Sequence, residues 1–187
     1  GAPAIFAGTD PADGKFFVGT KGVFNKNPKL NKTTADIKKN HSGDLATKLE
    51  IALKHLPSIG IKGVVQGDLL YTKSDLKTNS YDGNDYITFH PNTIVYAVPK
   101  GSKLAKQITA SKIGIVWHTL YSGRDLQSMQ AKFGMDITRK LKNNKNVFFT
   151  DAKYRDQSGK ATFTASETKE VTAHLSKAGS VFRNLPS

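Results

Sequence analysis

Residues 61–72 have the sequence IKGVVQGDLLYT, which is the strongest β-strand pattern in the chain. The segment is rich in β-branched and aromatic residues and is bounded on both sides by turn residues. Gly63 and Gly67 inside it indicate a bend or the close approach of another group. Asp68 stands among apolar neighbours, where a carboxylate is costly unless it meets a cation, a metal or backbone donors. The alternative is that strand alternation simply points Asp68 at solvent.

Shorter elements surround this strand. Between residues 2 and 24, β-prone runs alternate with turn residues, which predicts a hairpin or meander. Over residues 43–56, apolar residues recur at helical spacing and predict a helix that packs on a sheet. Further strands are expected at residues 86–89, 93–98, 113–118, 147–150 and 161–164. Further helices are expected directly after residue 102, at residues 125–133 and at residues 164–179, the last from a capping box. We therefore predict an antiparallel-rich α+β fold, with sheets flanked by helices, in a single domain spanning residues 1–187.

The composition points to a polyanionic partner. Lys and Arg number 28 against 15 Asp and Glu, so the net charge is +13. Nucleic acid, either DNA or RNA, is the expected partner, and the alternative is a surface that the lysines merely keep solvated. Only the stretch with Arg139, Lys140, Lys142 and Lys145 is clustered.

Other function classes are excluded by what the sequence lacks. There is no Cys, which excludes disulfides and thiolate zinc sites and fits a reducing compartment, and no apolar run is long enough to span a membrane. The five His residues show no metal-binding spacing, and the common phosphate-loop, dinucleotide and serine-nucleophile motifs do not occur. We expect a protein of the cytoplasm, including that of a phage-infected cell, without a membrane partner; its oligomeric state is left open.

Two further constellations carry candidate functional residues. In Thr20-Lys21-Gly22 a strand runs into a turn with one hydroxyl and one cation, groups suited to a phosphate or ribose. A solvated surface turn would have the same residues. In the other constellation an apolar strand ends at Trp117-His118, the only Trp of the chain. Such a Trp can stack on a purine, or it can belong to the core.

Taken in order, these segments resemble the covalent nucleotidyltransferase superfamily of ATP-dependent DNA ligases, RNA ligases and capping enzymes. Residues 1–6 (GAPAIF) look like the end of its Lys-x-Asp-Gly element and the following strand. Thr20-Lys21-Gly22 resembles its Ser/Thr-Arg-x-Gly element, and Gly67-Asp68-Leu69 resembles its Gly-Glu-Leu element. Residues 115–126 resemble the strand with an aromatic-Asp pair and the Leu-Tyr, turn, Gly-Lys/Arg-Asp-Leu stretch of DNA ligases. Closer kin are expected among ligase-like proteins of large tailed phages.

The resemblance, which covers roughly residues 1–126, implies a nucleotidyltransferase (ATP-grasp-like) core with ATP and Mg²⁺ as cofactors. It implies a nucleophilic Lys upstream of Gly1, so the catalytic residue lies outside this sequence. Asp68 would also bind the metal. The nucleotide-binding residues implied are Thr20, Lys21, Gly22, Asp68, Trp117 and His118.

The sequence departs from the family pattern in several places. In Thr20-Lys21-Gly22, Lys replaces Arg and one residue fewer stands before the Gly. His118 stands where the family has Asp, no Glu-Gly-x-Val element follows, and the nucleophilic Lys is not in the chain. Lys140-Leu141-Lys142 is not counted as the family's late Lys-x-Lys pair, because no strand pattern leads into it. The chain is therefore expected to be either a fragment of a longer enzyme or a degenerate relative without catalysis, and inactive on its own.

The leading hypothesis is a ligase-like nucleotidyltransferase domain that acts on nucleic-acid ends, and in its full-length form an ATP-dependent polynucleotide ligase. The alternatives are a non-catalytic basic nucleic-acid-binding module and a viral structural or assembly protein. The first hypothesis requires that Lys21, Asp68 and Trp117 line one concave site open near Gly1. Under the alternatives these three side chains have no reason to converge.

Overall fold

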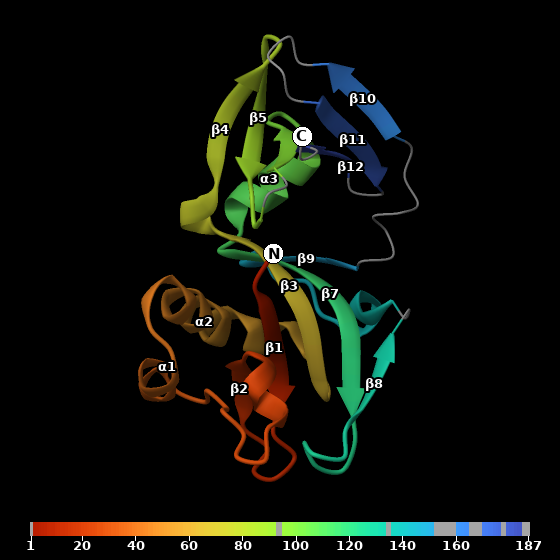
Figure 1. Ribbon diagram of the computed structural model, residues 1–187. Helices are drawn as coiled ribbons and strands as arrows, with labels where there is room; N and C mark the ends of the chain where they lie inside the picture. Colours follow the sequence, from red (N-terminus) through yellow and green to blue (C-terminus); the bar gives the residue numbers. More distant parts are fainter. Residues whose placement is uncertain are drawn as a thin grey trace.

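The computed structural model describes residues 2–92, 95–133, 136–151, 160–164, 170–176 and 179–184, the last three ranges as strands without their side chains. Two sheets dominate the fold, one in each half of the molecule (Figure 1). The first sheet has the order β2-β1-β3-β7-β8, with β9 paired to β7. Its strands are β1 (Ala4–Thr9), β2 (Phe16–Gly19), β3 (Val64–Thr72), β7 (Ile113–Ser122), β8 (Gln130–Phe133) and β9 (Val147–Asp151). All its pairings are antiparallel except that of β7 with β9.

The second sheet is antiparallel throughout and has the order β10-β11-β12-β6-β5-β4. Its strands are β4 (Lys77–Tyr81), β5 (Asn84–Phe89), β6 (Val95–Pro99), β10 (Lys160–Thr164), β11 (Glu170–Ser176) and β12 (Gly179–Asn184). Helix α3 (Lys103–Ala110) begins where Ser102 accepts a hydrogen bond from Ala105 N, as the sequence predicts. The apolar side of α3 packs in one core with β5, β6, Tyr71 of β3 and Val116 of β7. The two sheets therefore meet in one hydrophobic core, where β3 ends and β7 begins.

Helices cover one face of the first sheet. Helix α1 (Thr34–Asn40) begins with a capping box at Thr33, and α2 (Gly43–His55) continues into the 3₁₀ segment η2 (Leu56–Ile59). Leu49, Ala52 and Leu56 of this layer are fully buried against the sheet. Short 3₁₀ segments complete the structure: η1 (Lys21–Phe24), η3 (Lys73–Asp75) and η4 (Ile137–Lys140). Among the described residues, no helix has the length and apolar character to cross a membrane.

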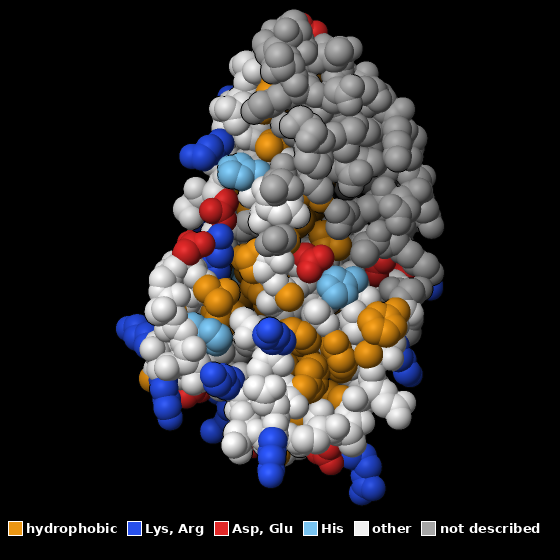
Figure 2. All heavy atoms as spheres, in the orientation of Figure 1, with side chains coloured by type: hydrophobic (Ala, Val, Ile, Leu, Met, Phe, Trp, Pro, Cys, Tyr) orange, Lys and Arg blue, Asp and Glu red, His pale blue; other side chains and the backbone are white. Residues whose placement is uncertain are grey.

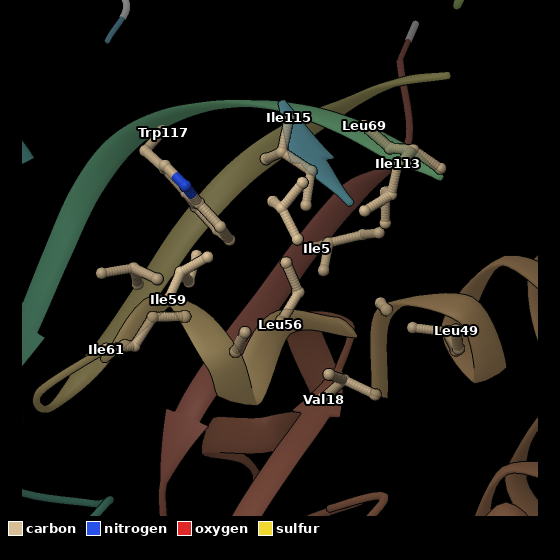
Figure 3. Packing of buried hydrophobic residues seen from close by; sticks show 14 of the residues in the cluster. Ile5, Val18, Leu49, Leu56, Ile59, Ile61, Leu69, Ile113, Ile115 and Trp117 are labelled. Atoms are coloured by element: carbon tan, nitrogen blue, oxygen red, sulfur yellow. The ribbon is translucent and has the colours of Figure 1, made fainter. Parts of the chain in front are cut away.

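Gly67 allows β7 to pack closely on β3. An added Cβ at Gly67 would lie 2.5 Å from the Val116 carbonyl oxygen and 2.7 Å from the indole ring of Trp117. The indole points into the core below the sheet, toward Ile59 and Ile61 (Figure 3). The predicted close approach at Gly67 is therefore confirmed, and the approaching group is Trp117.

The α+β class and the predominance of antiparallel strands are confirmed, and two predicted helices are wrong. Residues 125–133 form a turn, in which Ser128 N donates to the Asp125 carboxylate, followed by strand β8. Residues 164–179 contain the end of β10 and the whole of β11, where the sequence predicts a helix. In both places long-range strand pairing overrides local helix signals. The elements α1, β4 and β12 are not anticipated by the sequence patterns.

Candidate functional site

A polar pair lies on the face of the first sheet opposite the helices. The Asp68 side chain on β3 is 40% exposed and the His118 side chain on β7 is 30% exposed. His118 Nε2 lies 3.5 Å from Asp68 Oδ1, so the two groups form an ion pair whenever the imidazole is protonated. His118 Nδ1 shares a hydrogen bond of 2.7 Å with the Thr119 hydroxyl. Thr119 thereby fixes the orientation of the imidazole toward Asp68.

A β-bulge at His118 creates this arrangement. Gln66 pairs with Thr119 while the next residue, Gly67, pairs with Trp117, so β7 has one extra residue at this point. A bulge reorients the side chains of its strand and is common beside functional sites. Here the extra residue is His118, which lies beside Asp68 and contacts the Thr119 hydroxyl, while Trp117 enters the core on the other face.

Aromatic side chains continue this face beyond the polar pair. Tyr121 Oη donates a 2.7 Å hydrogen bond to Gln66 Oε1, two residues from Asp68 along β3. The Tyr121 ring lies 4.6 Å from that of Phe24 and 5.9 Å from that of Phe6, measured between ring centroids. Burial raises the pKa of Tyr121 above its ordinary value, so the hydroxyl stays protonated and remains a donor. Figure 2 shows on this face an acidic side chain next to a histidine, with hydrophobic side chains below them.

The segment Thr20-Lys21-Gly22 lies on the same side of the sheet as Asp68. Strand β2 ends at Gly19, and η1 follows with Lys21 exposed at its start. The Thr20 side chain makes no capping hydrogen bond, and Gly22 O accepts hydrogen bonds from Asn25 N and Lys29 N, which close the turn. Phe24, at the end of η1, contacts both Phe6 and Tyr121. Gln66 and Tyr121 thus lie between the η1 segment and Asp68.

The prediction that Trp117 lines this site is wrong. Its side chain is fully buried, and it packs on the helix-covered side of the sheet with Ile59 and Ile61. Its indole Nε1 is buried without a hydrogen-bond partner among the described residues. The predicted convergence of Lys21, Asp68 and Trp117 therefore fails, because the indole packs against Gly67 on the far side of β3. The site that the structure presents consists of Asp68 and His118, with η1 on the same face.

The same face holds one carboxylate suited to a divalent cation. Asp68 lies beside His118, and the described part of the chain has no cluster of three or more His, Asp or Glu side chains that would hold a metal by itself. Mg²⁺ is commonly bound through one or two carboxylates together with phosphate oxygens of a substrate. Asp68 fits that role as a single protein ligand.

Comparison with known proteins gives one match. A family model described as a family of unknown function (DUF6267) matches residues 1–186. The chain belongs to this family. No curated protein and no solved structure matches the chain significantly. Membership of the DUF6267 family therefore leaves the function to be argued from the site itself.

Sequence reasoning identified Asp68, His118, Thr20 and Lys21 but missed Gln66, Tyr121 and Phe24. The signal for Gln66 was present, because it stands two residues before Asp68 and must share its face of the strand. The β-bulge at His118 could not be predicted from the sequence. A one-residue shift in the pairing of β7 depends on how two distant strands meet.

Proposed function

We propose that this domain binds a nucleoside triphosphate on the Asp68–His118 face and, by that chemistry, is related to the ligase-like nucleotidyltransferases that act on nucleic-acid ends. Because Trp117 is buried, the proposal gives up the three-residue site with Lys21, Asp68 and Trp117 and rests on the pair Asp68–His118. The observation that carries the proposal is the pairing of Asp68 with His118 at a β-bulge, partly exposed on the face of the sheet opposite α1 and α2. A structural carboxylate between two strands would be expected to be satisfied by backbone donors. Asp68 instead has a titratable partner and free access to solvent.

The start of β1 supports the proposal. Ala4 pairs with Asp68, and Leu69 N donates to the Pro3 carbonyl oxygen at 2.9 Å. The resemblance requires that the end of the Lys-x-Asp-Gly element and the Gly-Glu-Leu acid act on the same nucleotide. The antiparallel pairing of β1 with β3 brings the two corresponding segments side by side, although more than sixty residues separate them in the sequence.

The side chains of this face fit a metal-bound nucleotide. Asp68 supplies one hard oxygen ligand, and a magnesium ion held there with the phosphates would neutralise their charge. The imidazole of His118 and the exposed ammonium group of Lys21 can donate hydrogen bonds to phosphate oxygens. With Trp117 in the core, the aromatic groups on this face that can support a base include Tyr121, Phe24 and the exposed Phe133, which is paired with Thr119.

The net charge of +13 supports action on nucleic acid. It equally favours the second candidate, a basic nucleic-acid-binding module or viral assembly protein without nucleotide chemistry. The two candidates differ in one measurable property, because only the first requires nucleotide binding that depends on Asp68.

The test is calorimetric titration of the chain with ATP and Mg²⁺. Asp68→Asn should weaken binding by about tenfold or more, since it removes a charged ligand of the metal-bound nucleotide. Asp82→Asn is the matched control, because Asp82 is an exposed turn residue with a φ of 51° that Asn adopts readily. A second pair compares Lys21→Gln with Lys26→Gln, both exposed and close in sequence.

Equal affinities for the wild type, Asp68→Asn and Asp82→Asn would contradict the proposal. Absence of any ATP binding by the wild type would favour the module without nucleotide chemistry. The isolated chain should also acquire no covalent label from radiolabelled ATP, since the expected nucleophilic Lys is not among its residues. A stable adduct on one of its lysines would show that the motifs are misassigned.

A further inference from the structure

A second surface of the molecule is strongly basic and lies on the helix-covered side of the first sheet. It is built where the end of α2, the segment η2 and the residues leading into β9 come together. Lys142 N donates to the Ile59 carbonyl oxygen at 2.9 Å, and the Lys142 side chain lies along Gly60, 3.4 Å from the place of an added Cβ. Lys112 N donates to the Asn146 carbonyl oxygen at 2.8 Å, which places Lys112 beside the backbone next to Lys145.

The fourth lysine of this surface is Lys54, which precedes His55 at the end of α2. Burial lowers the pKa of His55, and the positive charges of Lys54 and Lys112 lower it further. Both ammonium groups therefore act on one imidazole at the end of α2. Lys54, Lys112, Lys142 and Lys145 are all exposed, and we call these four residues the basic surface.

The three segments that carry the basic surface contain no acidic residue, although Glu50, one turn before Lys54 on α2, and Asp136 lie just outside them. Residues 54–62, 111–113 and 137–147 include no Asp or Glu. The basic residues of these three segments are Lys54, Lys62, Lys112, Arg139, Lys140, Lys142 and Lys145. Surface lysines that serve only solubility are usually interspersed with acids. A negatively charged partner could therefore neutralise the positive charge of the basic surface.

The chemistry of that partner follows from what the surface lacks. Stable protein interfaces have an apolar, often aromatic centre. The one large hydrophobic side chain that is strongly exposed in the described part of the chain is Phe133 on β8, outside the three basic segments. A surface with dense positive charge and no apolar anchor suits a regularly charged phosphate backbone.

We infer that the basic surface binds the sugar-phosphate backbone of nucleic acid, away from the Asp68–His118 face. The inference rests on the proposed action on nucleic acid and adds the place of contact. Since helices α1 and α2 cover the opposite face of the sheet from Asp68, backbone binding and nucleotide binding use separate residues. Contacts of this kind hold nucleic acid without reading its sequence.

The experiment measures binding of an oligonucleotide with unphosphorylated ends, single-stranded and as a duplex, by filter binding over a series of salt concentrations. The variant carries Lys54→Gln, Lys112→Gln, Lys142→Gln and Lys145→Gln. The control removes the same charge elsewhere with Lys77→Gln, Lys100→Gln, Lys103→Gln and Lys106→Gln, which are exposed residues on or near the second sheet and α3.

We expect the basic-surface variant to lose at least about tenfold in affinity at low salt and to reduce the slope of log affinity against log salt by roughly 3. The control should keep most of the affinity. Equal losses in the two variants would overturn the inference, as would wild-type binding that is insensitive to salt or tighter binding of a polyglutamate chain than of nucleic acid.

The proposed nucleotide site and the proposed nucleic-acid surface can be contradicted independently of each other. Loss of nucleic-acid binding in the basic-surface variant, with ATP titration unchanged, supports the separate surface. Asp68→Asn should leave binding of the unphosphorylated oligonucleotide intact, and a loss there would contradict the separation. If the wild type binds nucleic acid through the basic surface but does not bind ATP, the nucleotide site is wrong and the backbone surface stands.

Discussion

The two faces of the β3–β7 strand pair both contain buried side chains, Val64 and Val116 among them on the face of Asp68, and they differ most clearly beside the bulge. On the helix-covered face, Leu69, Ile115 and Trp117 are buried in a continuous apolar core (Figure 3). On the other face, Asp68 and His118 are partly exposed and face each other. The same strands thus stabilise the fold with one set of side chains and present polar groups with the other.

Because of this difference, Asp68 and His118 can be replaced with less loss of stability than Leu69, Ile115 or Trp117. Trp117 and His118 are neighbours in sequence, and the alternation of side chains along β7 assigns one to the core and the other to the polar face.

Replacing Trp117 tests the apolar face. Trp117→Ala should lower the free energy of unfolding by about 3–5 kcal/mol, because it leaves a large cavity in a packed core. Asp68→Asn should change it by less than about 1 kcal/mol, since a half-exposed ion pair contributes little. Urea denaturation followed by circular dichroism measures both. Similar destabilisation by the two substitutions would show that the faces do not differ in the way described.

Replacing Gly67 tests the close packing of the two strands. Gly67→Ala should destabilise the fold by about 1–3 kcal/mol, because its Cβ would meet the Val116 carbonyl oxygen at 2.5 Å. Gly101→Ala is the control, since no atom lies within 4 Å of its added Cβ. The same denaturation experiment applies. A neutral Gly67→Ala substitution would mean that β7 can move away from β3 at no cost.

The smallest expected effect is a pH dependence of stability that arises from His41, on the helix-covered side of the first sheet. His41 Nε2 lies 3.2 Å from Asn31 Nδ2, and the Asn31 side-chain amide also donates to the Val18 carbonyl oxygen, so the imidazole must be neutral to accept its hydrogen bond. Burial, followed by the charge of Lys29, lowers the pKa of His41 below 6.5. The unfolded chain therefore binds the proton more readily, and the stabilisation is complete above about pH 6.5 and is lost as the pH falls through the lower folded pKa.

Denaturation midpoints between pH 5 and pH 7.5 measure this dependence. His41→Gln should reduce the dependence of the denaturation midpoint on pH. Adding His55→Gln should reduce the remaining dependence further, because the pKa of His55 is lowered as well. A pH dependence unchanged in His41→Gln would remove His41 from the explanation. Neither substitution should change binding at the Asp68–His118 face.

Much of the fold could be predicted from local patterns. The strand at residues 61–72, the helix at residues 43–56 and the cap at Ser102 are confirmed because periodicity and capping are local properties. The helices predicted at residues 125–133 and 164–179 failed because pairing with distant strands decided their conformation. Thr164 and Glu167 have the spacing of a capping box, yet Thr164 pairs with Glu170 in a sheet.

The candidate site could be predicted only in part. Asp68 was identified because a carboxylate in an apolar strand requires an explanation, and His118 because it follows the strand that carries the only Trp. Their contact could not be predicted, since it depends on the register of β3 against β7. The role of Trp117 was mistaken because an indole suits a purine and a protein core equally well, and only packing distinguishes the two.

The position of Trp117 also makes the protein its own optical reporter. The chain has one Trp, and its indole is shielded from water in the core between α2 and the first sheet. Its fluorescence should therefore be blue-shifted in the native state and move to the red when that half of the molecule opens. The core around Tyr71 and Phe89, which joins the second sheet, contains no indole among its described residues. Tryptophan emission compared with circular dichroism would thus reveal whether the two halves unfold together or one after the other.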